Sequence, residues 1–536
     1  MNRMAFQAGP LADRVSKAFE AAAAENVVER IWRKDASLWK PDADNVRVIN
    51  NSLGWLTVAG EMIGVADELT EFADSIRSLG FQHVMVCGMG GSSLCPEVLA
   101  RTFGKQDGYP ELLVLDSTDA DVIAALAERI DIERCLFVIA SKSGTTTEPN
   151  VFYKYWYDEV SKRSENPGEN FIAITDPGSP LVETAEERKF RRTFLNQADI
   201  GGRYSALSYF GMVPAALMGI DIRRFLNRAT EAKVVAQDIA LQLGIILGEG
   251  ANAGHDKLTL VLDPEIETLG LWIEQLIAES TGKEGKGILP VHGESLGGPE
   301  VYGDDRLFVS ISKGAVSAET KAKLDALANA GHPIVYRELA DIYDLGAEFF
   351  VWEVATAIAG WRLGINPFDQ PNVQEAKDAT KELLKTFERR GHLDPWPETA
   401  SDPIALKPGD YVAFLNYIEE TPEIDRRFQE LRTQVRDATK CAVTVGYGPR
   451  FLHSTGQLHK GGPNTGVFFQ IIANDRVDFA VPGEPYTFSI LKQAQALGDF
   501  RALEKRARRV ISIDLGNDTL SGLTRLAEAI AAALSY

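Results

Sequence analysis

A dense run of hydroxyl side chains is the first candidate for chemistry in this chain. Residues 141–149 read Ser-Lys-Ser-Gly-Thr-Thr-Thr-Glu-Pro. The apolar residues 135–140 before them predict a buried parallel strand, and residues 150–156 after them predict the start of a helix. Free N–H groups and the positive end of the helix dipole favour an anion at such a corner. Ser and Thr also cap helices, but five hydroxyls in seven positions exceed what a cap needs. We therefore predict a phosphate site.

The phosphate-binding candidates in this loop are Ser141, Lys142, Ser143, Gly144, Thr145 and Thr146. A glycine-rich segment, residues 88–93 (Gly-Met-Gly-Gly-Ser-Ser), comes before them and also stands between a predicted strand and a predicted helix. Glycines let the backbone approach a ligand closely, and serines can donate hydrogen bonds. The glycine spacing differs from the dinucleotide-binding fingerprint. A tight turn with a helix cap explains the segment equally well by itself. Beside the hydroxyl loop, Gly91 and Ser92 are predicted to form a second wall of a sugar-phosphate pocket.

Two charged side chains fit roles in acid–base chemistry. Arg203 follows two glycines, and its fixed cation suits a phosphate or a developing oxyanion, although a surface salt bridge is the alternative. Glu279 lies near the end of an apolar helix, where a partly buried carboxylate can act as a general base. Gln275 lies four residues earlier and should share its helix face. The alternative is a Glu279 that pairs with Lys283 or Lys286 at a solvated helix end.

A lysine and two histidines complete the candidates. Lys377 lies about two turns into a helix that begins after Phe-Asp-Gln at 368–370, and a solvated lysine is the alternative. Residues 452–462 form a glycine-rich segment that holds His453 and His459, two of only seven histidines. Their spacing does not match a metal-binding pair on one helix, so the segment predicts proton transfer or substrate contact rather than zinc.

The elements that must position these residues alternate between strands and helices, which predicts doubly wound parallel sheets in an α/β protein. We expect an N-terminal helical arm over 1–50, a first α/β domain over 51–235, a second over 236–400, and a C-terminal region of mixed strands and helices over 401–536. The strands are predicted at 81–87, 112–115, 135–140, 171–175, 258–262, 307–311, 333–336, 411–415, 441–445, 467–472 and 510–513.

Composition excludes several classes of partner. With 56 basic and 76 acidic residues the net charge is −20, which argues against nucleic acid or an anionic membrane surface as the main partner. Four cysteines without a Cys-x-x-Cys pair indicate a reducing compartment. We see no apolar signal segment at the N-terminus and no membrane-spanning run. We expect a cytoplasmic protein that binds neither nucleic acid nor membrane.

Together these segments resemble the glucose-6-phosphate isomerase (phosphoglucose isomerase) family. The matching motifs follow the family's order and extend over roughly residues 50 to 380; they lie at 88–92, 141–147, 201–205, 279–283 and 368–377. The resemblance implies two sugar-isomerase (SIS) domains, which are flavodoxin-like sandwiches. The tail, with Ser-Thr-Gly-Gln-Leu-His-Lys-Gly-Gly, is most similar to the isomerase half of transaldolase–isomerase fusion proteins. No transaldolase half is visible.

The resemblance implies isomerisation of glucose 6-phosphate and fructose 6-phosphate through a cis-enediol, a reaction of glycolysis and gluconeogenesis. Glu279 would move the proton between C2 and C1, and Arg203 would stabilise the enediolate. Lys377 would assist ring opening, Gln275 would contact the substrate, and the hydroxyl loop would hold the phosphate. No metal or cofactor is implied. Family members are dimers with shared sites, which implies a homodimer.

The ring-opening histidine of the family has no counterpart at its usual place, because residues 294–305 contain no histidine. The later segment Gly-Gln-Leu-His at 456–459, followed by an aromatic pair, is similar to the missing one. We therefore expect His459 to open the ring, with His453 as second choice and His292 as third.

Two other functions are compatible with the same motifs. One is another SIS-type isomerase, which acts on mannose or amino-sugar phosphates. The other is a non-catalytic sugar-phosphate-binding SIS protein. Such a regulator would commonly carry a basic DNA-binding domain, and the net charge of −20 disfavours it.

Overall fold

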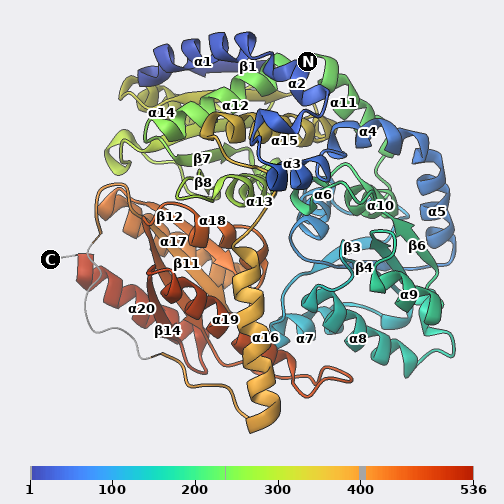
Figure 1. The fold of residues 1–536 in the computed structure, drawn as a ribbon. Coiled ribbons are helices and arrows are strands. Elements are labelled where there is room, and N and C mark those ends of the chain that lie inside the picture. The colour runs from blue at the N-terminus through green and yellow to red at the C-terminus, as the bar shows by residue number, and fades with distance from the viewer. Residues whose placement is uncertain (1–2, 236, 398–405, 535–536) are drawn as a thin grey trace.

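The computed structural model describes residues 3–235, 237–397 and 406–534. Within these residues the strands form three sheets, and helices cover both faces of each. Figure 1 shows the three sheets in three lobes that meet at the centre of the molecule. The predicted α/β class with doubly wound parallel sheets and a helical N-terminal region is confirmed, and the sheets are open rather than closed into a barrel.

The first sheet has the strand order β3-β2-β4-β5-β6, and all its strands are parallel. This is the flavodoxin-like order, in which ligands bind where the strand order reverses, here between β2 and β4. The sheet consists of β2 (His83–Cys87), β3 (Glu111–Leu115), β4 (Cys135–Ala140), β5 (Phe171–Thr175) and β6 (Arg192–Leu195). Its helices are α6 (Leu94–Phe103), α7 (Ala120–Arg129), α8 (Thr147–Ser161), α9 (Pro180–Glu187) and α10 (Tyr209–Leu217).

The glycine-rich segment follows β2, and the hydroxyl loop follows β4. Both therefore leave the carboxyl edge of the sheet at its reversal point. All six residues of β4 are buried, as the continuous apolar run requires of a central strand. The two predicted walls of the pocket are thus placed side by side by strand order alone.

The second sheet repeats this order as β8-β7-β9-β10, and β1 adds an antiparallel edge strand to β10. Its strands are β7 (Lys257–Leu262), β8 (Leu289–Val291), β9 (Arg306–Lys313), β10 (Ile334–Leu339) and β1 (Arg3–Gln7). The surrounding helices are α1 (Ala12–Ala24), α2 (Val27–Trp32), α3 (Ala43–Asn50), α4 (Trp55–Gly64), α11 (Ile222–Val235), α12 (Gln237–Asn252), α13 (Leu269–Thr281), α14 (Ala318–Asn329) and α15 (Leu345–Leu363). The helix α5 (Ala66–Ser78) packs instead against β6 and α10 of the first sheet.

The C-terminal region folds into a third parallel sheet with the same order, β12-β11-β13-β14. Its elements are β11 (Tyr411–Tyr417), α17 (Pro422–Thr439), β12 (Ala442–Tyr447), α18 (Gly456–Gly461), β13 (Gly466–Ile472), α19 (Phe488–Lys505), β14 (Arg509–Asp514) and α20 (Thr519–Leu534). A short 3-10 turn, η10 (Arg450–His453), lies between β12 and α18. This region is therefore more regular than the mixed arrangement predicted for it.

A long helix, α16 (Val373–Arg390), connects the second sheet to the third. Figure 1 shows it between the lobe of the first sheet and the lobe of the third, where it packs along α19. The helix α13 lies at the centre, close to all three lobes (Figure 1). Lys377 and Glu279, which lie on these two helices, are thus carried to the place where the three sheets converge.

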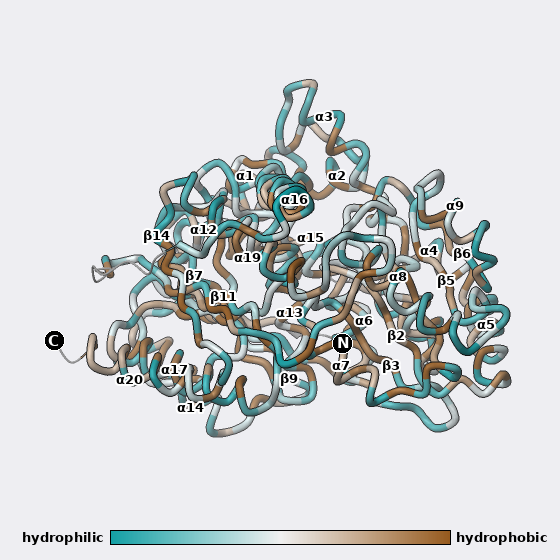
Figure 2. The backbone as a smooth tube through the Cα atoms, turned by 90° about the horizontal axis from the view of Figure 1, so that it is seen from below, coloured by the Kyte–Doolittle hydropathy of each residue, from teal (hydrophilic) through white to brown (hydrophobic). Residues whose placement is uncertain are grey.

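Hydropathy follows this layering. Figure 2 shows hydrophobic segments concentrated on the strands and hydrophilic turns on peripheral helices such as α5. No single helix among the described residues is long and apolar enough to cross a membrane; one bent pair, Ile222–Val234 with Gln237–Asn252, passes that test together.

Three strands, β1, β6 and β8, lie outside the segments predicted to be strands. β1 lies in the predicted helical arm, and its pairing with β10 adds residues 3–7 to the second sheet. β8 has only three residues and contains a proline. The predicted domain boundaries at 235 and 400 fall beside or within segments outside the described residues, and they stay predictions.

Candidate active site

The hydroxyl loop lines a cavity of about 120 Å³ between the first sheet, α16 and η10. Ser143, Thr145 and Thr146 lie on one side of it, and Lys377 and His453 line it as well. α8 begins at Thr147, directly after these residues, so its free N–H groups lie at the same corner. The structure thus combines hydroxyls, a helix N-terminus and a lysine around one cavity, which are the components of an anion site.

His453 lies opposite Glu148, the acidic residue that ends the hydroxyl run. Its Nε2 atom is 3.3 Å from Glu148 Oε1. Gln495 Nε2 donates to the same carboxylate oxygen at 2.6 Å, and Thr118 Oγ1 donates to Gln495 Oε1 at 2.6 Å. Burial raises the pKa of Glu148, but the neighbouring His453, together with the charge of Lys377, outweighs it and holds that pKa below its ordinary value. Glu148 is therefore ionised near neutral pH and orients the imidazole, as carboxylates do for catalytic histidines.

Glu279 lies between Gln275 and Arg203. Gln275 Nε2 is 3.2 Å from Glu279 Oε2, which confirms that the two residues share a face of α13. The Arg203 Nη1 atom is 3.5 Å from Glu279 Oε1. Gln275 Nε2 also donates to the backbone oxygen of His453 at 2.8 Å. One amide group thus connects the predicted base to the residue that lines the phosphate cavity.

Arg203 is buried and fully engaged. Nε donates to Ser280 Oγ at 2.7 Å, and Nη1 donates to Gln370 Oε1 at 3.0 Å. Nη2 donates to the backbone oxygens of Pro367 and Asp369 at 2.7 and 2.9 Å. The surface salt bridge considered from the sequence is excluded, because the side chain is 2 % exposed. These contacts fix the guanidinium beside Glu279.

The glycine-rich segment packs tightly against both halves of this arrangement. Gly90 has a φ of +54°, and a Cβ there would lie 2.7 Å from Gln275 Nε2 and 2.9 Å from the His453 oxygen. A Cβ on Gly91 would lie 1.9 Å from the backbone oxygen of Gly202. The glycines are therefore required for the close approach of Arg203 and His453 to the first sheet.

The remaining loop candidates lie around the cavity rather than in it. Lys142 donates to Asp176 and, at 2.8 Å, to the backbone oxygen of Ala198. Ser92 and Ser141 are buried, and Ser141 Oγ has no hydrogen-bond partner among the described residues. Gly144 has a φ of +66° and forms the bend of the loop. Lys142 therefore holds the loop from behind, with its ammonium committed elsewhere.

The structure places His459 away from this cavity. Its ring is buried, bonds the Tyr411 hydroxyl at 2.9 Å through Nδ1, and packs on Phe468. Burial lowers the pKa of His459 well below its ordinary value. It lies two positions after Gln457, which contacts Gly282 and Asn372, so the two side chains point to opposite sides of the short α18. Of the histidines considered, His453 lies at the cavity.

The third choice, His292, also lies elsewhere. Its Nε2 atom is 3.1 Å from Glu274 Oε2, and it follows the end of β8. Glu274 precedes Gln275 on α13 and therefore points to another face of that helix. His292 does not line the phosphate cavity.

Lys283 does not form the ion pair with Glu279 that the sequence offered as an alternative. Its ammonium does not pair with Glu279 but donates to Asp369 Oδ1 at 2.6 Å and to the Asn366 oxygen at 2.8 Å. Burial, and after it the charge of Arg203, lower the pKa of Lys283 from 10.5 to about 8. Lys283 thus adds a second positive charge near Glu279 and titrates close to neutral pH.

One cluster of three aspartates has carboxylate oxygens close enough together to hold a metal ion. Among the described residues, Asp119, Asp121 and Asp475 bring carboxylate oxygens within 4.8 Å of one another. However, the ammonium of Lys492 is bonded to both Asp119 and Asp475. That lysine supplies the positive charge at this position, so the group is an ion-pair cluster of the protein itself.

Glu148, Gln495 and Thr118 were not predicted as site residues. Glu148 could have been found, because an acidic residue directly after the hydroxyl run lies in the first turn of the helix beside the anion site. Gln495 and Thr118 come from other parts of the chain, and nothing in their local sequence distinguishes them.

The parallel sheets and a hydroxyl loop close to a buried Glu–Arg pair are the features that we compare with known proteins. Residues 54–286 match the family model described as phosphoglucose isomerase. The resemblance to that family is therefore confirmed, and the match contains the motifs from the glycine-rich segment to Lys283.

Two relatives illustrate the similarity. The glucose-6-phosphate isomerase of Staphylococcus saprophyticus is 28% identical over 351 residues, which cover 56% of this chain and 79% of that protein. That of Clostridium novyi is 28% identical over 408 residues, covering 64% of this chain and 88% of the relative. These relatives support a sugar-phosphate isomerase.

Solved structures show the same fold. A hypothetical protein from Thermus thermophilus superposes with a TM-score of 0.62 at 22% identity, covering 72% of this chain and 100% of that one. A glucose-6-phosphate isomerase from Chlamydia trachomatis gives a TM-score of 0.58 at 18% identity, covering 73% of this chain and 90% of that one.

The titration of Lys283 makes stability depend on pH. Its folded pKa of about 8 lies below the ordinary 10.5, so the unfolded chain binds more protons between these values. The free energy of unfolding should therefore rise from pH 8 towards pH 10 by about 1–3 kcal/mol relative to a Lys283→Met variant. Denaturant unfolding of both proteins across this range measures the difference; parallel curves would contradict the assignment.

Proposed function

We propose that this protein interconverts glucose 6-phosphate and fructose 6-phosphate through a cis-enediol, as an enzyme of glycolysis and gluconeogenesis. The observation that carries the proposal is the Glu279 carboxylate, held between the Gln275 amide and the Arg203 guanidinium and connected through Gln275 to the His453 turn at the phosphate loop. Two buried polar atoms without partners among the described residues, Ser141 Oγ and Gln275 Oε1, support a polar ligand here.

The phosphate is held by the hydroxyls of Ser143, Thr145 and Thr146 with Lys377 across the cavity. This anchor supplies binding energy at a distance from the reacting carbons, which positions C1 and C2 relative to the base. His453, oriented by Glu148, exchanges the proton between the ring oxygen and O1 as the ring opens, and Lys377 assists this step.

The chemical step then follows on the open chain. The Glu279 carboxylate removes the proton from C2, a C1=C2 double bond forms, and the electron pair of the aldehyde moves onto O1. Arg203 and Lys283 stabilise the enediolate, because preorganised positive charge helps most where negative charge develops. Glu279 returns the proton to C1, the hydroxyl proton moves from O2 to O1, and the ketose results.

The homodimer, the cytoplasmic location and the likeness to transaldolase–isomerase fusions stay predictions from the sequence. A coupled assay with fructose 6-phosphate, with mannose 6-phosphate as competitor, tests the sugar preference. Turnover of the mannose compound at a higher rate would assign the alternative isomerase.

Replacing the base separates catalysis from binding. Glu279→Gln should lower kcat by about 10²–10⁴-fold, because the amide cannot accept the C2 proton, while fructose 6-phosphate still binds. Coupled kinetics and calorimetry measure the two effects. The matched control is Glu274→Gln on the same helix, which should keep kcat within about threefold. Equal losses in both variants would contradict the role of Glu279.

Substitution of His453 should affect catalysis, whereas substitution of His459 should affect stability. His453→Asn should lower kcat on ring-closed substrate by about 10²-fold, because the proton exchange with the ring oxygen is lost. His459→Asn should instead lower the melting temperature and leave kcat nearly unchanged, because that ring packs in the third sheet. The opposite pattern would restore His459 as the ring-opening residue.

The phosphate loop should govern affinity. Ser143→Ala and Thr146→Val each remove a hydroxyl from the cavity, so KM should rise by about 5- to 50-fold with a smaller change in kcat. Inhibition by inorganic phosphate should weaken in parallel. A KM that stays at the wild-type value in both variants would move the phosphate site elsewhere.

A further inference from the structure

The turn that carries His453 also carries an arginine with no role in the reaction described above. Arg450 opens η10, and His453 closes it. Arg450 Nε and Nη2 bond the two carboxylate oxygens of Asp116, each at 2.9 Å. Nη1 bonds Glu420 Oε2 at 3.1 Å. Asp116 directly follows β3 of the first sheet, whereas Glu420 lies beyond the end of β11 in the third.

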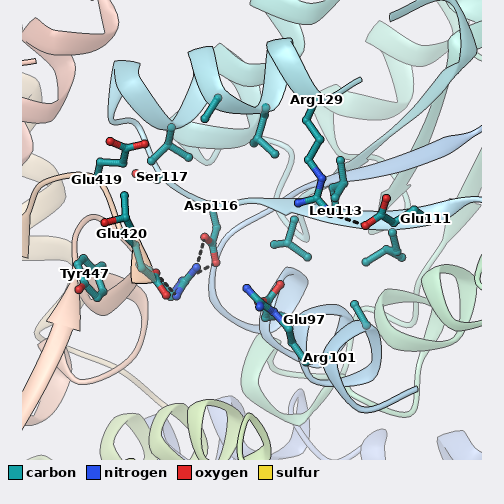
Figure 3. Close-up of a pocket in the computed structure, with 18 of the residues that line it drawn as sticks. Glu97, Arg101, Glu111, Leu113, Asp116, Ser117, Arg129, Glu419, Glu420 and Tyr447 are labelled. Atoms are coloured by element: carbon teal, nitrogen blue, oxygen red, sulfur yellow. Dashed lines mark hydrogen bonds and ion pairs between the residues drawn. The ribbon is translucent and has the colours of Figure 1, made fainter. Parts of the chain in front are cut away.

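Asp116, Glu420 and Arg450 line a cavity of about 520 Å³ between the two sheets. Figure 3 shows Asp116 and Glu420 on one side of this cavity, with dashed contacts to a guanidinium between them. The Asp116 side chain is 3 % exposed and that of Arg450 is 21 % exposed. A bidentate pair that is largely buried fixes both the distance and the plane of the guanidinium.

The His453 turn is therefore held at both ends. Arg450 anchors its start to the first sheet, and Gln275 bonds the backbone oxygen of His453 at its end. Between them, Phe451 packs edge-on against Tyr417 of the third sheet. Of these contacts, the Arg450–Asp116 pair is the one that joins the start of the turn to the sheet that also carries the phosphate loop.

We propose that Arg450 is a positioning residue, whose ion pair with Asp116 holds the His453 turn against the first sheet so that the imidazole reaches the sugar ring. The proposal rests on the proposed function, since it assigns a purpose to the place of His453. The third sheet then completes the active site of its own chain. The rate of ring opening depends on how that sheet packs against the first sheet.

The chain offers a matched control at the same junction. Arg476 also joins the third sheet to the first, with Nε 3.2 Å from Asp121 Oδ2 and Nη2 2.5 Å from Glu419 Oε2. It lies after β13, and its side chain is 67 % exposed. Arg476→Gln removes an ion pair between the same sheets without releasing the His453 turn.

The test compares Arg450→Gln and Asp116→Asn with this control. Both should lower kcat on glucose 6-phosphate by about 10- to 100-fold with KM within about threefold, as expected when a catalytic group is displaced by an ångström or so. A 4,5-dideoxyhexose 6-phosphate lacks both hydroxyls that close the ring, and its turnover should fall by less than about threefold. Arg476→Gln should stay within about twofold on both substrates.

Hydrogen exchange gives a readout that does not need activity. Amides of residues 450–456 should exchange faster in Arg450→Gln and Asp116→Asn, and at the wild-type rate in Arg476→Gln. Melting temperatures identify a variant that fails to fold, and Asp116→Asn keeps the side-chain shape for that case.

The outcomes separate the two proposals. Wild-type kcat in folded Arg450→Gln and Asp116→Asn, equal losses on ring-closed and ring-free substrates, or unchanged exchange over 450–456 would each overturn the positioning role. A wild-type protein that turns over neither hexose phosphate overturns the proposed function instead, while the exchange data still decide whether the ion pair holds the turn.

Discussion

The site depends on the hydrogen bonds that hold the buried guanidinium of Arg203. A charge taken out of water is tolerated only where its hydrogen bonds are satisfied. Here those bonds come from Ser280 on α13, from Gln370, and from the backbone oxygens of Pro367 and Asp369. The requirement ties the segment after the first sheet to α13 and to the chain that leads into α16. Glu279 is left as the negative group beside it, at 3.5 Å.

Strand order explains how residues far apart in the chain reach this point. All three sheets place the first strand of each unit beside the third, so the loops after these strands leave one edge together. In the first sheet these loops are the glycine-rich segment and the hydroxyl loop. In the second, α13 follows β7 and carries Glu279, the proposed base. The third sheet contributes η10 with His453. The first and third sheets therefore contribute segments that follow their strands, and the second contributes the C-terminal turn of α13.

Much of this could be predicted from the sequence, because strong local patterns determine it. The buried strands β4 and β5 were predicted to the residue, since continuous apolar runs between turns leave few alternatives. β1 could not be predicted in this way, because its partner β10 is more than three hundred residues away in the chain. The sequence could not show which of His453 and His459 lies at the cavity, for a similar reason. Motif similarity favoured His459, but the side of α18 on which a residue lies depends on packing against β11 and β13, which spacing alone does not reveal. Glu148 could be found from its position directly after the hydroxyls. Arg450 and Asp116 are far apart in the sequence and come into contact only in the folded chain.

The central claim is that Glu279 moves one proton between C2 and C1 of a hexose 6-phosphate. Proton NMR of fructose 6-phosphate incubated with the protein in D₂O tests it most directly. A carboxylate that holds the proton briefly beside solvent predicts interconversion with glucose 6-phosphate and deuterium at C2 of the aldose and C1 of the ketose, both abolished in Glu279→Gln. Interconversion that never incorporates deuterium would indicate a direct hydride shift, and it would contradict the account.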